Sequence, residues 1–100
     1  MEDRVPLVSV LMTAYNREKY IAEAIESVLA STYSNLELII VDDCSKDNTL
    51  QIATNYQAKD DRIKVYKNEK NLGDYPNRNK AASYAKGKYL KYVDSGRQPS

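Results

Sequence analysis

The feature that most constrains the fold is an alternation between short apolar runs and longer segments whose apolar residues recur with a helical period. The first run, Leu7 to Met12, is nearly unbroken in apolar side chains and is bounded by polar residues, which is typical of a strand buried on both faces of a parallel sheet. Asn16 is a candidate N-cap for the helix that follows. The apolar face of that helix would be formed by Ile21, Ala24, Ile25, Val28 and Leu29. A buried strand followed by an amphipathic helix is therefore predicted.

A second strand and helix come next. Leu36 to Val41 has the same buried character as the first run and ends in two aspartates. A second helix is expected to start near Ser45 or Asp47, because both residue types are good N-caps. The side of this helix that faces the core would be formed by Leu50, Ala53 and Tyr56.

The rest of the chain continues the alternation. Ile63 to Tyr66 predicts a shorter strand near a sheet edge, because its residues alternate between apolar and polar. A third helix is expected from Asp74 through Ala85, with Pro76 in its first turn and Gly87 as its C-terminal stop. Tyr89 to Val93 predicts a fourth strand. This order predicts an α/β fold, a parallel sheet of about four strands with helices on both faces.

Composition and charge exclude several classes of function. A length of 100 residues fits one domain, and a formal net charge of +1 gives no reason to expect nucleic acid as a partner. Cys44 is the only cysteine and there is no histidine, so a disulfide, a structural zinc site or a histidine base cannot be formed. The chain has no apolar run of transmembrane length and no signal-peptide layout. We expect a soluble, cytoplasmic protein.

Polar residues follow three of the four predicted strands. They are found at Thr13 to Asn16, at Asp42 and Asp43, and at Asp94 and Ser95. Parallel sheets bind ligands beyond the carboxyl ends of their strands, so these groups predict one binding site. The three glycines do not form a phosphate-binding motif. A bound diphosphate would therefore need a carboxylate-held divalent metal or an arginine such as Arg78 as its counter-charge.

Four segments, in order, carry a family resemblance. They are Val8 to Asn16, Leu38 to Thr49, Asn71 to Gly73 followed by Arg78 and Asn79, and Tyr92 to Ser95. Together they resemble glycosyltransferase family 2, an inverting family with the GT-A fold, over about residues 5–95. The match covers only the N-terminal part of a family domain. It implies a Rossmann-like nucleotide-binding half that takes a nucleotide-sugar donor, a UDP-sugar, for transfer to a saccharide or lipid-linked acceptor in polysaccharide biosynthesis.

The resemblance also implies roles for individual residues. Tyr15 matches a tyrosine near the uracil ring, and Asp43 matches the carboxylate that accepts a hydrogen bond from the ring N–H of the base. Asp94 matches the first acid of an Asp-x-Asp motif that meets the ribose and helps to place Mg²⁺ or Mn²⁺ on the diphosphate. The full set of implied donor-binding residues is Thr13, Ala14, Tyr15, Asp43, Arg78, Asp94 and Ser95, with Asp94 as the metal ligand.

Two departures from the family pattern limit what this chain can do. Position 96 is Gly where the family has the metal-binding Asp. The general base and most of the acceptor pocket come from a later segment in the family, so no catalytic residue is predicted here. We expect residues 1–95 to form the donor-binding part and residues 96–100 to be a disordered or truncated tail.

Simpler interpretations compete with these roles. An acidic pair after a strand commonly caps the next helix, but Ser45 and Asp47 could cap instead, which favours a ligand role for Asp43 and a structural role for Asp42. Arginines on helices are usually solvated or ion-paired. Packing is expected for three tyrosines, Tyr84, Tyr89 and Tyr92.

Two other functions are compatible with parts of the pattern. A stand-alone nucleotide-binding module without catalysis would explain Gly96 and the missing base. A signalling receiver domain would explain an acidic pair, but receivers carry that pair after the first strand, whereas here it follows the second.

Overall fold

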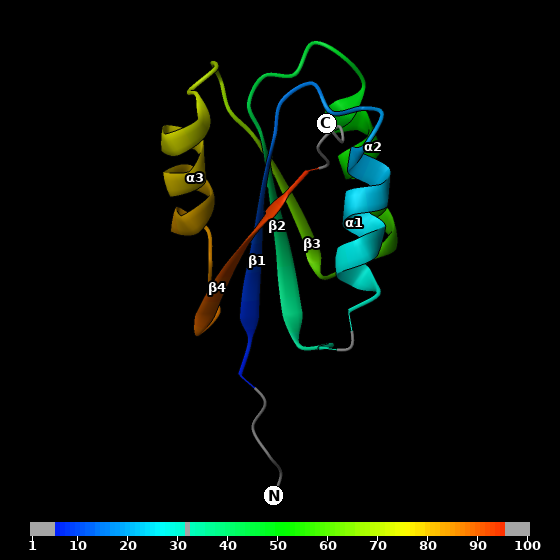
Figure 1. The fold of residues 1–100 in the computed structure, drawn as a ribbon, viewed down its shortest axis with the longest axis vertical. Helices are drawn as coiled ribbons and strands as arrows, with labels where there is room; N and C mark the ends of the chain where they lie inside the picture. The colour runs from blue at the N-terminus through cyan, green and yellow to red at the C-terminus, as the bar shows by residue number, and fades with distance from the viewer. Residues whose placement is uncertain (1–5, 32, 96–100) are drawn as a thin grey trace, which may run out of the picture.

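The strands and helices alternate along the whole described chain (Figure 1). The computed structural model describes residues 6–31 and 33–95, and the predicted tail at 96–100, including Gly96, lies outside them. The elements are β1 (Val8–Ala14), α1 (Ile21–Leu29), β2 (Leu36–Asp42), α2 (Thr49–Lys59), β3 (Ile63–Lys67), α3 (Asp74–Ser83) and β4 (Tyr89–Asp94). The predicted order of elements is confirmed.

The four strands form one parallel sheet in the order β3-β2-β1-β4. β1 and β2 lie in the interior, and their register pairs Val10 with Leu38 and Met12 with Ile40. Every residue of β2 is buried, as the unbroken apolar run predicted. The edge position expected for Ile63 to Tyr66 is confirmed, because β3 pairs only with β2 in the described sheet.

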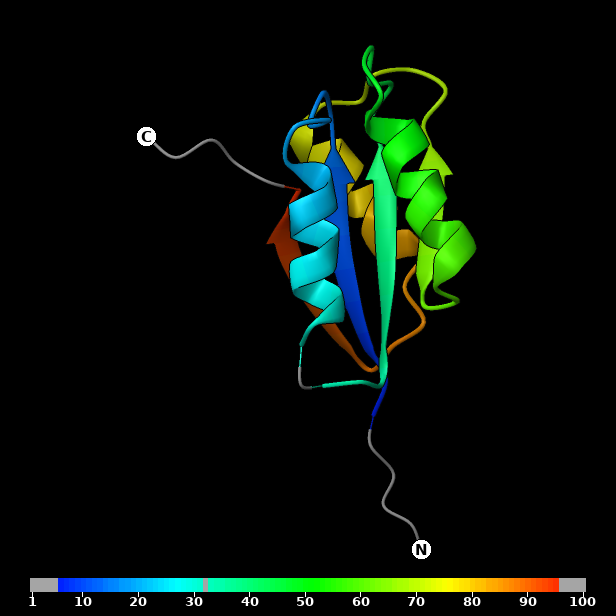
Figure 2. The same cartoon turned by 90° about the vertical axis from the view of Figure 1, so that its right-hand side faces the viewer.

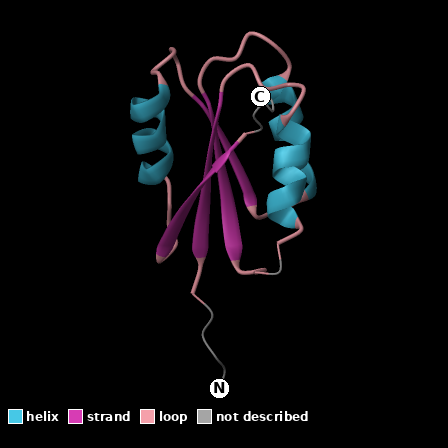
Figure 3. Ribbon diagram, in the orientation of Figure 1, coloured by secondary structure: helices cyan, strands magenta, loops and turns pink. Residues whose placement is uncertain are grey.

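The helices cover both faces of the sheet. α1 and α2 pack on one face and α3 on the other (Figures 1, 2 and 3). Alternate residues of β1 serve the two faces, since Val10 and Met12 belong to the core under α1 and α2 whereas Leu11 packs with Ala81 of α3. The predicted architecture of helices on both faces is confirmed.

The exposed edge is β4, and it differs from what the sequence predicted. Tyr89 is 54% exposed and Tyr92 is 47% exposed, so neither is packed as expected. Tyr84 does pack, because its ring stacks on that of Tyr66 with the centroids 3.7 Å apart. β4 pairs with β1 alone among the described strands, and most of its residues are exposed, although Val93 packs against the core.

The predicted start of α3 at Asp74 is confirmed, whereas the starts expected for α1 and α2 lie too early in the chain. Asn16 does not cap α1; it has a left-handed backbone (φ 54°), and its side-chain Oδ1 accepts a hydrogen bond from Lys46 N at 2.7 Å. α2 begins at Thr49, and Asp47 Oδ1 accepts the Thr49 N–H at 2.9 Å. The loop after β1 and the loop after β2 are hydrogen-bonded to each other at the carboxyl ends of the two strands. α1 and α2 begin only after these contacts.

Gly87 does not end α3, which stops at Ser83 with Tyr84 as its C-cap. Instead it lies against the start of β1, where its N–H donates to Ser9 Oγ at 2.8 Å. Ser9 Oγ donates to Glu37 Oε2 at 2.6 Å, and Lys86 N donates to the same oxygen at 2.7 Å. This buried network joins the α3–β4 connection to β1 and β2 at the end of the sheet opposite the polar loops.

No helix in residues 6–31 and 33–95 is long and apolar enough to cross a membrane.

Candidate donor-nucleotide site

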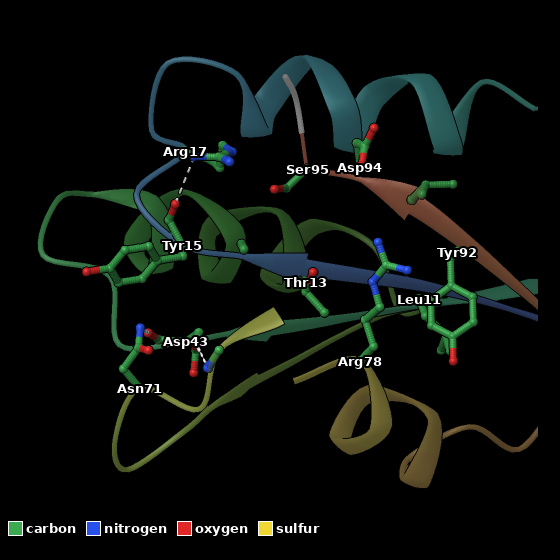
Figure 4. A pocket seen from close by; sticks show the side chains of 13 residues that line it. Leu11, Thr13, Tyr15, Arg17, Asp43, Asn71, Arg78, Tyr92, Asp94 and Ser95 are labelled. Carbon is green, nitrogen blue, oxygen red and sulfur yellow. Dashed lines mark hydrogen bonds between the residues drawn. The ribbon is translucent and has the colours of Figure 1, made fainter. Parts of the chain in front are cut away.

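A cavity of about 610 Å³ opens at the carboxyl ends of β1 and β4 (Figure 4). Its size is that of a typical small-molecule site. All seven residues predicted to bind the donor line it: Thr13, Ala14, Tyr15, Asp43, Arg78, Asp94 and Ser95. Six further residues also line it: Leu11, Arg17, Asn71, Gly73, Tyr92 and Val93. The structure therefore brings the three predicted polar groups and α3 together around one space.

Asp43 is the most buried charged group of the cavity, with 3% of its surface exposed. Its carboxylate accepts three N–H groups: Asn68 Nδ2 at 2.9 Å and Leu72 N at 2.7 Å on Oδ1, and Gly73 N at 3.0 Å on Oδ2. Hydrogen bonds of this kind stabilise a buried charge. Asn71 Nδ2 adds a bond to the backbone oxygen of Asp43 at 3.1 Å. Asp43 thus fixes the 71–73 loop beside the end of β2.

Asp42, the other member of the acidic pair, faces a different structure. Its carboxylate accepts hydrogen bonds from Ser45 N at 2.9 Å and from Ser45 Oγ at 2.6 Å. Asp42 is buried and does not line the cavity. It therefore holds the turn after β2, which agrees with the structural role expected for it.

The loop after β1 is positioned by the loop after β2. Asn16 N donates to Ser45 Oγ at 2.8 Å, and Arg17 N donates to Thr49 Oγ1 at 2.7 Å. Arg17 Nη1 bonds back to the Tyr15 carbonyl at 3.1 Å. Tyr15 and Arg17 are thereby held at the cavity (Figure 4). Sequence reasoning missed Arg17, although its place in the same strand-end loop as Tyr15 could have indicated it.

Arg78 enters the cavity from α3, between two tyrosine rings. The centre of its guanidinium group lies 5.7 Å from the ring of Tyr92 and 6.0 Å from that of Tyr75. Both distances allow cation–π attraction. Tyr92 was expected to pack in the core, but it lines the cavity with Arg78 (Figure 4). Two arginines and two aspartates line the cavity, and the carboxylate of Asp43 is already bonded to three N–H groups.

The cavity offers few ligands for a metal ion. Across the described part of the chain, no three Asp, Glu or Cys side chains are grouped closely enough to hold one. Mg²⁺ is usually held by one or two carboxylates together with waters and substrate phosphates, and among the described residues the cavity lining contributes the carboxylates of Asp43 and Asp94. The described residues therefore form no all-protein metal centre, and an ion here would also need oxygen ligands from the diphosphate or from water.

Comparison with known proteins finds glycosyltransferases among the relatives of this chain. The family model described as glycosyl transferase family 2 matches residues 9–98. The Escherichia coli UDP-Glc:alpha-D-GlcNAc-diphosphoundecaprenol beta-1,3-glucosyltransferase WfgD is 43% identical over 89 residues, which are 89% of this chain and 34% of that protein. The chain spans about a third of the length of the curated relatives it matches.

Solved structures agree with the sequence comparison. The S. aureus TarS fragment 1–349 in complex with UDP-GlcNAc is 40% identical with a TM-score of 0.81, covering 88% of this chain and 27% of that one. A mannosyltransferase from Pyrobaculum calidifontis, in complex with GDP-Man and Mn²⁺, has a TM-score of 0.83 at 22% identity, covering 90% and 27%; at that identity the likeness shows the shared fold alone. The GT-A-like fold and the family match agree, and the chain belongs to glycosyltransferase family 2.

Proposed function

We propose that this chain forms the donor-nucleotide site of a glycosyltransferase that uses a UDP-sugar. The observation that carries the proposal is the convergence of seven residues, singled out from the sequence, around one cavity at the carboxyl edge of the sheet. Two related proteins add support, because TarS binds UDP-GlcNAc at 40% identity and WfgD is named for a UDP-Glc donor.

The base of the nucleotide would be recognised by Asp43 and Tyr15. A carboxylate can accept about four hydrogen bonds, and from the described part of the chain Asp43 accepts three, of which only one is on Oδ2. Oδ2 can therefore accept the N3–H of uracil. The ring of Tyr15 offers an aromatic face to the base, and it is partly exposed at the cavity.

The diphosphate would be bound by Arg78 and Arg17. Both guanidinium groups belong to the cavity lining, and arginine binds phosphate oxygens through charge-assisted hydrogen bonds. Asp94 and Ser95, at the end of β4, would then meet the ribose. In the complete reaction an acceptor hydroxyl attacks the anomeric carbon, the bond to the nucleoside diphosphate breaks, and the configuration inverts. A general base outside this chain takes the proton.

The acceptor is proposed from similarity alone. WfgD is named for a lipid-linked saccharide acceptor, GlcNAc-diphosphoundecaprenol. We infer an acceptor of the same class, a saccharide or lipid-linked saccharide used in polysaccharide biosynthesis. A cytoplasmic location and a metal-ligand role for Asp94 stay predictions.

Calorimetric titration of the 100-residue chain with UDP tests the donor site. We expect UDP to bind and ADP to bind at least about tenfold more weakly, because a purine has neither the shape nor the N3–H that the site would read. Repeating the titration with Mn²⁺, for the wild type and Asp94→Asn, tests the metal: a gain in affinity that Asp94→Asn removes would support the predicted ligand. Absence of UDP binding by a chain shown to be folded by circular dichroism would contradict the proposal.

Replacing Tyr92 with leucine is expected to weaken UDP binding about two- to fivefold, which is the effect of losing a partly exposed cation–π contact with Arg78. Tyr92→Phe keeps the ring and should bind UDP as the wild type does. Uridine, which has no diphosphate, should bind the wild type and Tyr92→Leu equally. Titration of all three proteins with UDP and uridine measures this.

Tyr89→Leu is the matched control for that loss. Tyr89 is on the same strand and is similarly exposed, but its ring lies near Lys88 and outside the cavity lining. Equal losses of UDP affinity in Tyr89→Leu and Tyr92→Leu would show that the effect comes from strand β4 and not from Arg78.

A further inference from the structure

Two buried asparagines lie behind the cavity, and neither was singled out from the sequence. Asn68 is 5% exposed and Asn77 is 2% exposed. Asn68 follows β3, and Asn77 is in α3, one residue before Arg78. Neither is part of the cavity lining. Buried amide groups are unfavourable unless they are hydrogen-bonded, so their partners indicate what they do.

The two side chains form a hydrogen-bonded chain that ends on Asp43. Asn68 Nδ2 donates both to Asp43 Oδ1, at 2.9 Å, and to Asn77 Oδ1, at 2.6 Å. Asn77 Nδ2 donates more weakly to the backbone oxygen of Val41, at 3.4 Å. The backbone of Asn68 is also fixed, because its N–H donates to Asp42 O at 2.9 Å. The network therefore runs from β2 through α3 and back to the carboxylate at the end of β2.

The direction of the Asn68 amide is determined by its neighbours. Both groups that face Nδ2, the Asp43 carboxylate and Asn77 Oδ1, are acceptors, so turning the amide over would place oxygen against oxygen. Its own Oδ1 is buried without a partner in the described structure. Leaving a buried carbonyl unpaired lowers stability, and such groups in native proteins call for a specific explanation. The Asn68 amide is therefore oriented so that Nδ2 donates to Asp43, and this orientation leaves Oδ1 without a partner among the described residues.

The consequence for Asp43 is that its two oxygens differ. Oδ1 accepts from both Asn68 Nδ2 and Leu72 N, whereas Oδ2 accepts from Gly73 N alone among the described residues. The carboxylate cannot rotate without breaking the bonds on Oδ1. Oδ2 is therefore the oxygen that keeps room for a further N–H donor.

We propose that Asn68 and Asn77 are positioning residues that hold the Asp43 carboxylate so that the site selects a base with a ring N–H over one with a ring acceptor. This rests on the proposed function, in which Asp43 meets the base. Uracil presents N3–H to such an oxygen. Cytosine presents the lone pair of its N3 and would be repelled. Because Asn77 and Arg78 are neighbours on α3, the same network also links the base-binding carboxylate to the helix that carries the phosphate-binding arginine.

The test is the ratio of the dissociation constants for CDP and UDP, measured by calorimetry on the full 100-residue chain. In the wild type we expect CDP to bind at least about tenfold more weakly than UDP. Asn68→Ala removes one of the two donors on Oδ1 and leaves Leu72 N in place, and we expect the ratio to fall by about five- to tenfold, mainly through weaker UDP binding. Asn77→Ala leaves the bond from Asn68 to Asp43 in place, so we expect a partial fall in the ratio, by about threefold.

Ser9→Ala is the matched control. It removes two hydrogen bonds, to Glu37 and from Gly87, at the opposite end of the sheet. It should lower the urea midpoint as the asparagine variants do, but leave the CDP-to-UDP ratio unchanged. A purely structural role for Asn68 and Asn77 would make all three variants behave alike.

The outcomes separate this inference from the proposed function. A folded wild type that binds no UDP overturns both. A wild type that prefers UDP, together with variants that keep the full preference, overturns the positioning role alone. If Asn68→Ala does not fold, Asn77→Ala decides, because a lowered ratio supports the role and an unchanged ratio overturns it.

Discussion

Asp43→Ala is expected to lower the affinity for UDP by about a hundredfold or more and to destabilise the fold at the same time. The binding loss follows from removing a charged hydrogen-bond acceptor for the base, which contributes about 1.5–3 kcal/mol, and from releasing the 71–73 loop. The loss of stability follows because three N–H groups, on Asn68, Leu72 and Gly73, lose their acceptor. Calorimetry with UDP and urea unfolding followed by circular dichroism measure the two effects.

Asp42→Ala is the control that separates binding from folding. Asp42 is adjacent in sequence and equally buried, but its carboxylate bonds to Ser45 and does not line the cavity. It should lose stability as Asp43→Ala does and, while folded, bind UDP at least about tenfold more tightly than Asp43→Ala, because Asp42 affects the cavity through Ser45 and the loop after β1 and not by direct contact. Asp43→Ala that is folded and still binds UDP normally would remove Asp43 from the donor site.

The fold was predictable because it depends on hydrophobic periods that are written locally in the chain. The apolar run of β2 and the helical spacing from Ile21 to Leu29 each match the burial that the structure shows. The starts of α1 and α2 were not predictable in the same way. Asn16 and Ser45 are good N-caps by type, yet they bond to each other's loops across the sheet, and such contacts between distant segments have no local signal.

The candidate site was predictable to the extent that it follows from strand ends. Thr13, Asp43 and Asp94 all lie where parallel strands finish, so their convergence follows from the topology. Asn68 and Asn77 were missed because their role depends on how α3 packs against the end of β2. A buried asparagine and a solvated one look the same in a sequence. Tyr92 was misjudged for a related reason, since its place at the cavity depends on how β4 lies relative to Arg78 of α3.

Gly87→Ala is expected to destabilise the fold by about 1–3 kcal/mol, although glycine-to-alanine changes often stabilise a chain. A Cβ at this position would lie 2.7 Å from Leu7 O, 2.7 Å from Ser9 Oγ and 2.8 Å from Ser9 N. Two of these atoms are backbone atoms at the start of β1, and Leu7 O also accepts Lys88 N at 2.8 Å. Relief therefore requires β1 and the α3–β4 connection to move apart. Urea unfolding of the variant and wild type measures the difference in free energy.

Ser9→Ala combined with Gly87→Ala shows which contact matters. Removing the Ser9 hydroxyl takes away one close atom but leaves Leu7 O and Ser9 N in place, so we expect no recovery of stability in the double variant. Recovery to the level of Ser9→Ala alone would mean that the side chain, and not the backbone, sets the limit. Unchanged stability of the single Gly87→Ala variant would contradict the close approach altogether.

Gly73→Ala provides the opposite case, in which space is available but the backbone is not suitable. No atom lies within 4 Å of a Cβ placed there, but φ is +88°, a backbone angle that residues other than glycine rarely adopt. The two glycines therefore act at opposite ends of the same sheet for different reasons. Gly87 lets the connection before β4 approach β1, and the strand that begins there carries Asp94 to the cavity. Gly87→Ala should consequently weaken folding while leaving UDP affinity of the folded fraction unchanged, because its clash is confined to the amino ends of the strands and Asp43 is held by contacts at the carboxyl ends.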